Sequence, residues 1–314
     1  MNSAHDQNLK ASLNERSGFQ VWWRLLRPHT ITAAFVPVFV GTMVAALDGS
    51  INFWLFSAML AASILIQVGT NMFNEYYDYI RGLDNETSVG IGGAIVRDGV
   101  RPRTVLVLAL TFFVIAILLG IYICASSSWW IALIGTVSML CGYLYTGGPY
   151  PLAYTPFGEF AAGLFMGTII IAISYYIQTL EITTDIILIS LPVALFVGAI
   201  LLANNIRDRE GDKTNGRKTL AILFGHKGAV TFLKSMFSVA YVATVIFIFV
   251  GMLPLWSFIT LISGFKAREA VQGFKHKSSP LEMMPAMKAT AQTNTFYGLL
   301  LGLSLLLELN FPIS

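Results

Sequence analysis

Long, unbroken apolar runs are the feature that most restricts the fold of this chain. A helix that crosses a bilayer needs about 20 mostly apolar residues. The sequence has nine runs that approach this length: 31–47, 52–73, 104–124, 129–146, 157–178, 186–206, 229–250, 254–268 and 291–309. Only 12% of its 314 residues are charged, whereas soluble domains have about 25% charged residues. We therefore predict an all-α membrane protein.

The number of membrane crossings follows from the same runs. A transmembrane β-barrel would show alternating segments of about 10 residues rather than long apolar runs. The nine runs predict about nine transmembrane helices. The eighth run is the weakest, because Lys266, Arg268 and Glu269 interrupt it early. Eight helices is therefore the alternative.

The distribution of positive charge predicts the orientation. All 20 lysine and arginine residues lie in the N-terminal segment or in and near alternate loops, at 78–103, 147–156, 207–228 and 269–290. The intervening turns contain no basic residue; they are 48–51, 125–128, 179–185 and 251–253. Cytoplasmic loops of membrane proteins are enriched in lysine and arginine. We therefore expect a cytoplasmic N-terminus and an external C-terminus.

The polar start of the chain differs from the rest. Residues 1–26 are predicted to form a polar N-terminal segment with an interfacial lead-in, in which Trp22 and Trp23 belong to the aromatic belt of the membrane. Residues 27–314 are predicted to form a single transmembrane domain.

Two clusters of acids and amides end apolar runs on the predicted cytoplasmic side. In the first, Asn74 and Asp78 lie one helical turn apart on one face. Gly82 is expected to end that helix, so that Asp84 can fold back toward the same point. In the second cluster, a polar residue recurs at every fourth position: Asn204, Asp208 and Asp212. Acids at membrane depth are costly and mark candidate functional sites.

The chemistry of these side chains favours a divalent metal. Carboxylate and amide oxygens suit Mg²⁺, which typically takes one or two carboxylates and completes its shell with water and phosphate oxygens. Either cluster alone could be a solvated helix end. Together they predict one site for a diphosphate bridged by Mg²⁺ ions, with six candidate ligands: Asn74, Asp78, Asp84, Asn204, Asp208 and Asp212.

Basic residues interleave with the second cluster. Positive-inside bias or anionic lipid can account for basic residues near a membrane. Because guanidinium groups clamp phosphate oxygens, we expect Arg207, Lys213 and Lys218 to bind a diphosphate, together with Arg81 beside the first cluster.

Tyrosines gather in the loop that follows the fourth run. Interfacial aromatic residues usually belong to the membrane belt, but their faces can also shield a cation. Tyr145 and Tyr154 are the candidates for such a role. Glu159, just inside the fifth run, is either a buried functional acid or a helix-start residue that reaches the interface.

With these motifs the chain resembles the UbiA-type intramembrane aromatic prenyltransferases. That family has two aspartate-rich motifs on cytoplasmic loops and nine helices around a central cavity. Four runs carry the resemblance, and their spacing is similar to the branch that prenylates 1,4-dihydroxy-2-naphthoate for menaquinone: Asn74-x₃-Asp78-x₅-Asp84, Asn204-Asn205-Ile206-Arg207-Asp208-x₃-Asp212, Gly216-Arg217-Lys218-Thr219-Leu220-Ala221 and Tyr145-Thr146-Gly147-Gly148-Pro149. Many relatives have a lysine a few residues after the tyrosine at the place of Tyr145, where this chain has Gly148-Pro149.

The resemblance implies a reaction. Mg²⁺ at the two motifs would bind the diphosphate of a polyprenyl donor, with Asp78 and Asp208 essential to its ionisation and Tyr145 or Tyr154 beside the cation. The naphthoate ring would attack, with loss of CO₂ and diphosphate, to give demethylmenaquinone. The expected partners are the two substrates and membrane lipid, with no nucleic acid. The expected location is a bacterial cytoplasmic membrane, with the active site facing the cytoplasm.

Two alternatives remain open from the sequence. A sister prenyltransferase would share this chemistry but take another acceptor, such as 4-hydroxybenzoate, homogentisate or haem. A cation-coupled transporter would place its site near the midplane, at broken helices related by internal repeats. In this sequence the acids fall at helix ends instead.

Overall fold

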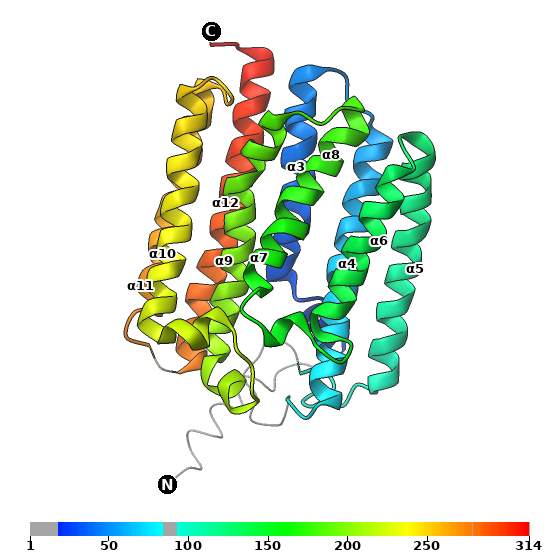
Figure 1. Cartoon of the computed structure of the whole chain (residues 1–314), viewed down its shortest axis with the longest axis vertical. Coiled ribbons are helices and arrows are strands. Elements are labelled where there is room, and N and C mark those ends of the chain that lie inside the picture. The colour runs from blue at the N-terminus through cyan, green and yellow to red at the C-terminus, as the bar shows by residue number, and fades with distance from the viewer. Residues whose placement is uncertain (1–17, 84–92, 278, 314) are drawn as a thin grey trace.

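The computed structural model describes residues 18–83, 93–277 and 279–313. Throughout these ranges the regular structure is helical, with no strand (Figure 1). The helices up to the middle of the chain are α2 (Phe19–Leu26), α3 (Pro28–Asp48), α4 (Phe53–Ile80), α5 (Pro102–Ser126), α6 (Trp130–Thr146), η1 (Leu152–Tyr154), α7 (Gly158–Ala162), η2 (Gly163–Ile169) and α8 (Ile170–Thr179). They are followed by α9 (Thr184–Thr214), α10 (Leu220–Phe249), η3 (Leu255–Ser263), α11 (Gly264–Phe274) and α12 (Pro280–Asn310). The all-α prediction is confirmed.

Six helical segments in the described ranges are long and apolar enough to cross a membrane: α3, α4, α5, the continuous segment Gly158–Thr179, α9 and α10. A shorter apolar helix, α6, lies between them in the sequence. The chain is therefore a multi-pass membrane protein. The weak eighth run does not form one regular α-helix, because its first part is the 3₁₀ segment η3 and α11 begins at Gly264.

Local signals in the sequence set several helix ends. Asn52 caps α4, because its side chain accepts hydrogen bonds from the backbone N–H groups of Trp54 and Leu55. At the other end, α4 stops at Ile80, and Gly82 takes a positive φ of 69°. Glycine adopts this left-handed conformation without strain, and the N–H of Leu83 returns to the carbonyl of Asp78. The prediction that Gly82 ends this helix is confirmed.

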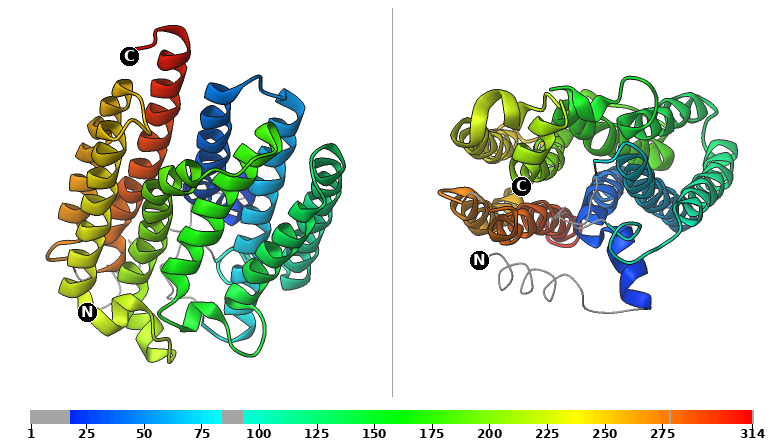
Figure 2. Two further views of the ribbon diagram at one scale, coloured as in Figure 1. Left: turned by 45° about the horizontal axis from the view of Figure 1, so that its top comes forward. Right: turned by 90° about the horizontal axis from the view of Figure 1, so that it is seen from below.

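Helices far apart in the sequence pack side by side. α3, near the start, contacts α12, at the end, as well as α4 and α8 (Figures 1 and 2). α9 is central in the same way, because it contacts α10, α12 and η2. The two helices that carry the acidic clusters, α4 and α9, thus share α3 and α8 as neighbours.

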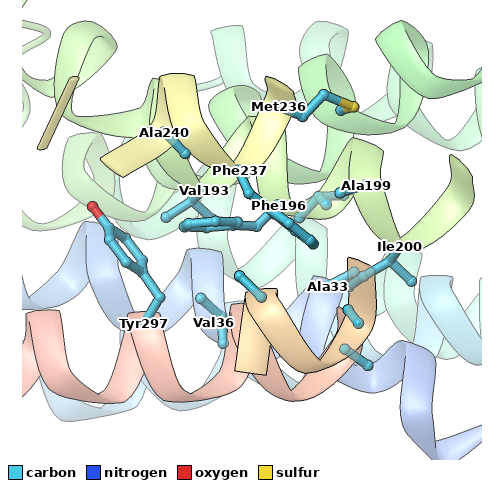
Figure 3. Close-up of a cluster of buried hydrophobic side chains, with 14 of the residues drawn as sticks. Ala33, Val36, Val193, Phe196, Ala199, Ile200, Met236, Phe237, Ala240 and Tyr297 are labelled. Atoms are coloured by element: carbon cyan, nitrogen blue, oxygen red, sulfur yellow. The ribbon is translucent and has the colours of Figure 1, made fainter. Parts of the chain in front are cut away.

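A buried aromatic core joins α9, α10 and α12 (Figure 3). The ring of Phe196 lies 4.7 Å from that of Tyr297 and 6.0 Å from that of Phe237, measured between centroids. Tyr297 is fully buried, and its hydroxyl shares a 2.7 Å hydrogen bond with Thr244. Buried hydroxyls need such a partner. This core fixes α9, and therefore the second acidic cluster, against the C-terminal half of the bundle.

Candidate functional site

A cavity of about 450 Å³ runs between the helices and is polar at one end. Along α4 its lining changes from Met59 and Ala62 to Asn74 and Asp78. Along α9 it changes in the same direction, from apolar side chains to Asp208 and Asp212 near the helix end. Both acidic clusters therefore face one cavity, whose remaining lining is mostly apolar.

Arg217 links the two clusters directly. Its Nη2 lies 2.8 Å from Oδ1 of Asp78 on α4, and its Nη1 lies 3.0 Å from Oδ1 of Asp212 on α9. The side chains of Arg217, Asp78 and Asp212 are 14%, 18% and 10% exposed. Such ion pairs, partly screened from water, are stronger than surface pairs. The structure thus brings Asp78 and Asp212 to a single guanidinium group.

The environment of Arg217 keeps it charged. Burial alone would lower the pKa of Arg217. The nearby carboxylates of Asp78 and Asp212 raise it by more than burial lowers it, so the pKa of Arg217 lies above its ordinary value. The ring of Tyr154 lies 5.3 Å from the guanidinium carbon, within the range of a cation–π contact. Arg217 is therefore a permanent cation between two acids and an aromatic face.

The other polar residues of the motifs also reach the cavity. Asn74 and Asn204 line it, and Oδ1 of Asn74 accepts a 2.7 Å hydrogen bond from the hydroxyl of Thr146. Asp208 lines it as well and pairs with Arg207, whose Nε lies 2.7 Å from its Oδ1. Arg207 itself is buried, with an Nη1 atom 3.1 Å from the sulfur of Met287.

The donor set of this site suits a divalent metal. Oδ2 of Asp212 is buried, and within the described ranges it has no hydrogen-bond partner. A buried carboxylate oxygen without a partner is costly, and coordination to a metal would satisfy it. No preformed group of three or more histidine, cysteine or acidic side chains suited to a metal occurs in the described part of the chain. Asp84, the third expected carboxylate of the first motif, lies outside the described residues.

The four predicted diphosphate-binding cations occupy different positions. Arg207 lines the cavity, whereas Lys213 and Lys218 are exposed and are not among the cavity-lining residues of the described ranges. Arg81 donates hydrogen bonds to the carbonyl oxygens of Thr146 and, at 2.8 Å, of Gly148. The guanidinium of Arg81 thus holds the turn that follows Tyr145, in which this chain has Gly148-Pro149.

The candidate tyrosines also differ in position. Tyr145 lines the same cavity as Arg217, Asp212 and Asp78. Tyr154 is not among the described residues that line it, and the centroid of its ring is 5.3 Å from the guanidinium carbon of Arg217 and 5.9 Å from that of Arg81. Tyr145 is thus placed to face a molecule in the cavity, whereas Tyr154 is placed to support two arginines.

Sequence reasoning missed the role of Glu75, a buried acid that links the first motif to two other segments of the chain. Glu75 is only 1% exposed; its Oε1 accepts a 2.6 Å hydrogen bond from the N–H of Gly93, and its Oε2 lies 3.4 Å from Arg27. Arg27 lines the cavity. The signal in the sequence was the acid directly beside Asn74, but its partners lie 18 and 48 residues away along the chain.

Glu159 is a buried acid, one of the two roles left open by the sequence. It is 3% exposed, and its Oε1 accepts a 2.8 Å hydrogen bond from Nδ2 of Asn205, which is also buried. Asn205 lines the cavity next to Asn204. Because its amide nitrogen is held by Glu159, Asn205 presents a fixed orientation at the second motif.

Replacing Glu159 with leucine is expected to destabilise the fold by about 1–3 kcal/mol, because the buried amide of Asn205 then loses its acceptor. Glu159→Gln should cost less, since a glutamine oxygen can still accept that hydrogen bond. Equilibrium unfolding in mixed detergent micelles would measure both. Equal stability of the wild type and Glu159→Leu would contradict the structural role of this pair.

Known proteins resemble this chain along most of its length. The UbiA prenyltransferase family matches residues 34–279. The 1,4-dihydroxy-2-naphthoate octaprenyltransferase of Bacillus subtilis is 54% identical over 308 residues, which cover 98% of this chain and 99% of the relative. The Mycobacterium tuberculosis protein of the same name is 30% identical and covers 87% of this chain and 92% of its own.

Solved structures share the fold at low sequence identity. The apo structure of a UbiA homologue from Aeropyrum pernix K1 has a TM-score of 0.67 at 14% identity, covering 90% of this chain and 98% of that one. A UbiA homologue from Archaeoglobus fulgidus, bound to DMAPP and Mg²⁺, has a TM-score of 0.57 at 15% identity, and the match covers 88% of this chain and 98% of that one. The fold, the cavity and these matches agree: the chain belongs to the UbiA prenyltransferase family.

Proposed function

We propose that this prenyltransferase transfers a polyprenyl chain from polyprenyl diphosphate to 1,4-dihydroxy-2-naphthoate, with loss of CO₂ and diphosphate, to give demethylmenaquinone. The observation that carries the proposal is the 54% identity, over nearly the whole of both chains, to an enzyme named for that acceptor. The cavity supports it, because a polar end beside a long apolar lining suits a diphosphate with an apolar chain.

The two motifs form the proposed Mg²⁺ site. Support comes from the oxygen-rich donor set, the unpartnered Oδ2 of Asp212, and the Mg²⁺ bound to the Archaeoglobus homologue. The proposed ligands are Asn74, Asp78, Asp84, Asn204, Asp208 and Asp212. When bound, Mg²⁺ neutralises the charge that develops on the departing diphosphate.

Protein cations complete the proposed diphosphate site. Arg207 lines the cavity beside Asp208, and a guanidinium there can donate paired hydrogen bonds to phosphate oxygens. The exposed Lys213 and Lys218 remain predicted contacts at the mouth of the site. We assign Arg81 a positioning role as well, because it already holds two carbonyl oxygens of the turn after Tyr145.

The apolar part of the cavity protects the reaction. Side chains such as Met166, Ile169 and Ile173 line it, and an allylic cation formed among them is kept from water. The face of Tyr145 at the cavity wall can stabilise that cation through its π-electrons, while Tyr154 acts through the arginines that it supports. The aromatic ring of the acceptor is then the available nucleophile.

We infer nine membrane crossings with a cytoplasmic N-terminus, a single domain over 27–314, and an active site that faces the cytoplasm of a bacterium. The support is the set of helices α3 to α12, and the absence of basic residues from the turns opposite the motifs. Helix α2 fits an interfacial lead-in, since its Trp22 and Trp23 are 40% and 48% exposed.

An acceptor comparison tests the proposed function. The purified protein in lipid nanodiscs, supplied with Mg²⁺ and a polyprenyl diphosphate, should release CO₂ and diphosphate in equal amounts with 1,4-dihydroxy-2-naphthoate. Acceptors such as 4-hydroxybenzoate and homogentisate should react at least about a hundredfold less efficiently, because they lack the second fused ring and leave apolar surface unfilled. Mass spectrometry of the products measures this. Preferential turnover of another acceptor would contradict the proposal.

A further inference from the structure

Arg217 lies against two carboxylates that the proposed metal site also requires. It extends from the linker between α9 and α10 and donates to Oδ1 of Asp78 and Oδ1 of Asp212 at 2.8 and 3.0 Å. Both carboxylates are proposed metal ligands on different helices. A guanidinium group and a divalent cation are both positively charged, and both are attracted to the same two carboxylate groups. Arg217 contacts Oδ1 of each, and Oδ2 of Asp212 has no partner among the described residues.

The two cations cannot share these carboxylates without a large penalty. Mg²⁺ binds oxygen at about 2.0–2.1 Å. An arginine that kept both hydrogen bonds would lie only a few ångströms from the ion, where repulsion between like charges is strong in a site of low dielectric constant. Metal binding therefore requires Arg217 to release at least part of its contact with Asp78 and Asp212.

The local structure allows the side chain to turn while its backbone stays fixed. The N–H of Arg217 donates to the carbonyl of Asp212, and the N–H of Lys218 donates to the carbonyl of Tyr154, each at 3.0 Å. The guanidinium lies over the ring of Tyr154, which offers no directional hydrogen bond to hold it. Nε of Arg217 is buried and has no partner among the described residues, so the group has a donor available for another acceptor.

We propose that Arg217 is an exchangeable counter-ion, which pairs with Asp78 and Asp212 until a divalent metal binds these carboxylates and then turns to the diphosphate. This inference rests on the proposed metal-binding role of the two aspartates. Arg217 then has two successive roles. Before metal binding it holds α4 and α9 together, and afterwards its fork of N–H groups matches phosphate oxygens.

The exchange has a thermodynamic consequence. Metal binding alone must weaken these ion pairs, so Arg217 lowers the affinity for metal when no diphosphate is present. Diphosphate gives the released guanidinium a new partner and so removes that penalty. Metal and diphosphate should therefore bind cooperatively, and the coupling must be the same in both directions.

Mn²⁺ binding without any substrate tests the exchange. Electron paramagnetic resonance of Mn²⁺ added to the purified full-length protein would give the Kd. Arg217→Gln should bind Mn²⁺ at least about tenfold more tightly than the wild type, within the usual range of coupling between sites. In EDTA the same variant should melt at a lower temperature, because the link between α4 and α9 is lost, and Mn²⁺ should raise its melting temperature more than that of the wild type.

Arg209→Gln is the matched control. Arg209 lies on α9 between Asp208 and Asp212, and its side chain pairs with the adjacent, exposed Glu210. This substitution removes the same charge from a nearby position, close to the end of α9, without breaking the link between the clusters. Its Mn²⁺ affinity should stay close to that of the wild type. An equal decrease in the Kd for Mn²⁺ in Arg209→Gln and Arg217→Gln would mean that any lost positive charge near the site has this effect, and it would overturn the proposal. An unchanged or higher Kd in Arg217→Gln would overturn it as well.

Two further variants keep the test decisive. If Arg217→Gln does not fold, Arg217→Lys retains the charge but loses the two-pronged contact, and it should bind Mn²⁺ more tightly than the wild type by a smaller factor. An unchanged Kd in Arg217→Lys would then overturn the exchange. Asp78→Asn separates this inference from the function on which it rests. If it leaves Mn²⁺ binding intact, the metal assignment itself fails, whatever Arg217 does.

Discussion

Replacing Asp78 or Asp208 with alanine is expected to reduce prenyl transfer at least about a thousandfold, since stabilisation of a leaving diphosphate by a bound metal contributes several kcal/mol and each 1.36 kcal/mol corresponds to a factor of ten in rate. The two residues lie on different helices and line one cavity. Removing either should therefore have a similar effect, although they are far apart in the sequence. Release of diphosphate from a polyprenyl donor at saturating acceptor would measure the loss.

Asp185→Ala provides the control for this loss. Asp185 is an exposed acid in the first turn of α9, at the end opposite Asp208. Its removal changes the net charge equally but leaves the cavity lining intact, so turnover should stay within about twofold of the wild type, as expected for a surface substitution. Normal turnover in Asp78→Ala and Asp208→Ala would refute the metal assignment. Wild-type melting temperatures in both variants would exclude unfolding as the cause of a loss.

The helical fold was predictable from the sequence because of one strong constraint. In a bilayer every backbone polar group must find a partner within the protein, so long apolar runs become helices. The predicted runs 31–47 and 104–124 fall inside α3 and α5. The interior of the fifth run was not predictable. It contains the π-helical segment η2, which lies where Gly163 and Gly167 approach α9, a contact that the spacing within one apolar run does not reveal.

The site was predictable only in part for a related reason. Local spacing placed Asn74 with Asp78, and Asn204 with Asp208 and Asp212, because residues four apart share a helix face. The partner of Arg217 could not be found in this way, since Asp78 lies 139 residues away. Sequence spacing also could not separate Arg207, which is buried at the cavity, from Lys213, which is exposed. Both belong to the same interleaved run of charges.

Two glycines hold the Gly158–Thr179 segment between α3 and α9. A Cβ atom on Gly41 of α3 would lie 2.5 Å from the carbonyl oxygen of Ile171, and one on Gly167 would lie 2.5 Å from Cα of Ala194 on α9. Both obstacles are backbone atoms, which cannot turn aside as a side chain can. Small residues allow membrane helices to approach this closely, and the packing itself supplies much of their association energy.

The double variant Gly41→Ala, Gly167→Ala is therefore expected to lose about 2–6 kcal/mol of folding free energy, because overpacking costs about 1–3 kcal/mol at each site. Gly135→Ala, in α6, is the matched control, since a Cβ there meets nothing within 4 Å. Alanine is the better helix former by roughly 0.5–1 kcal/mol, so the control should be neutral or more stable. Equilibrium unfolding in mixed micelles measures both. Equal stabilities would mean that α3 and α9 can separate around this segment, which would contradict the close packing that forms one wall of the cavity.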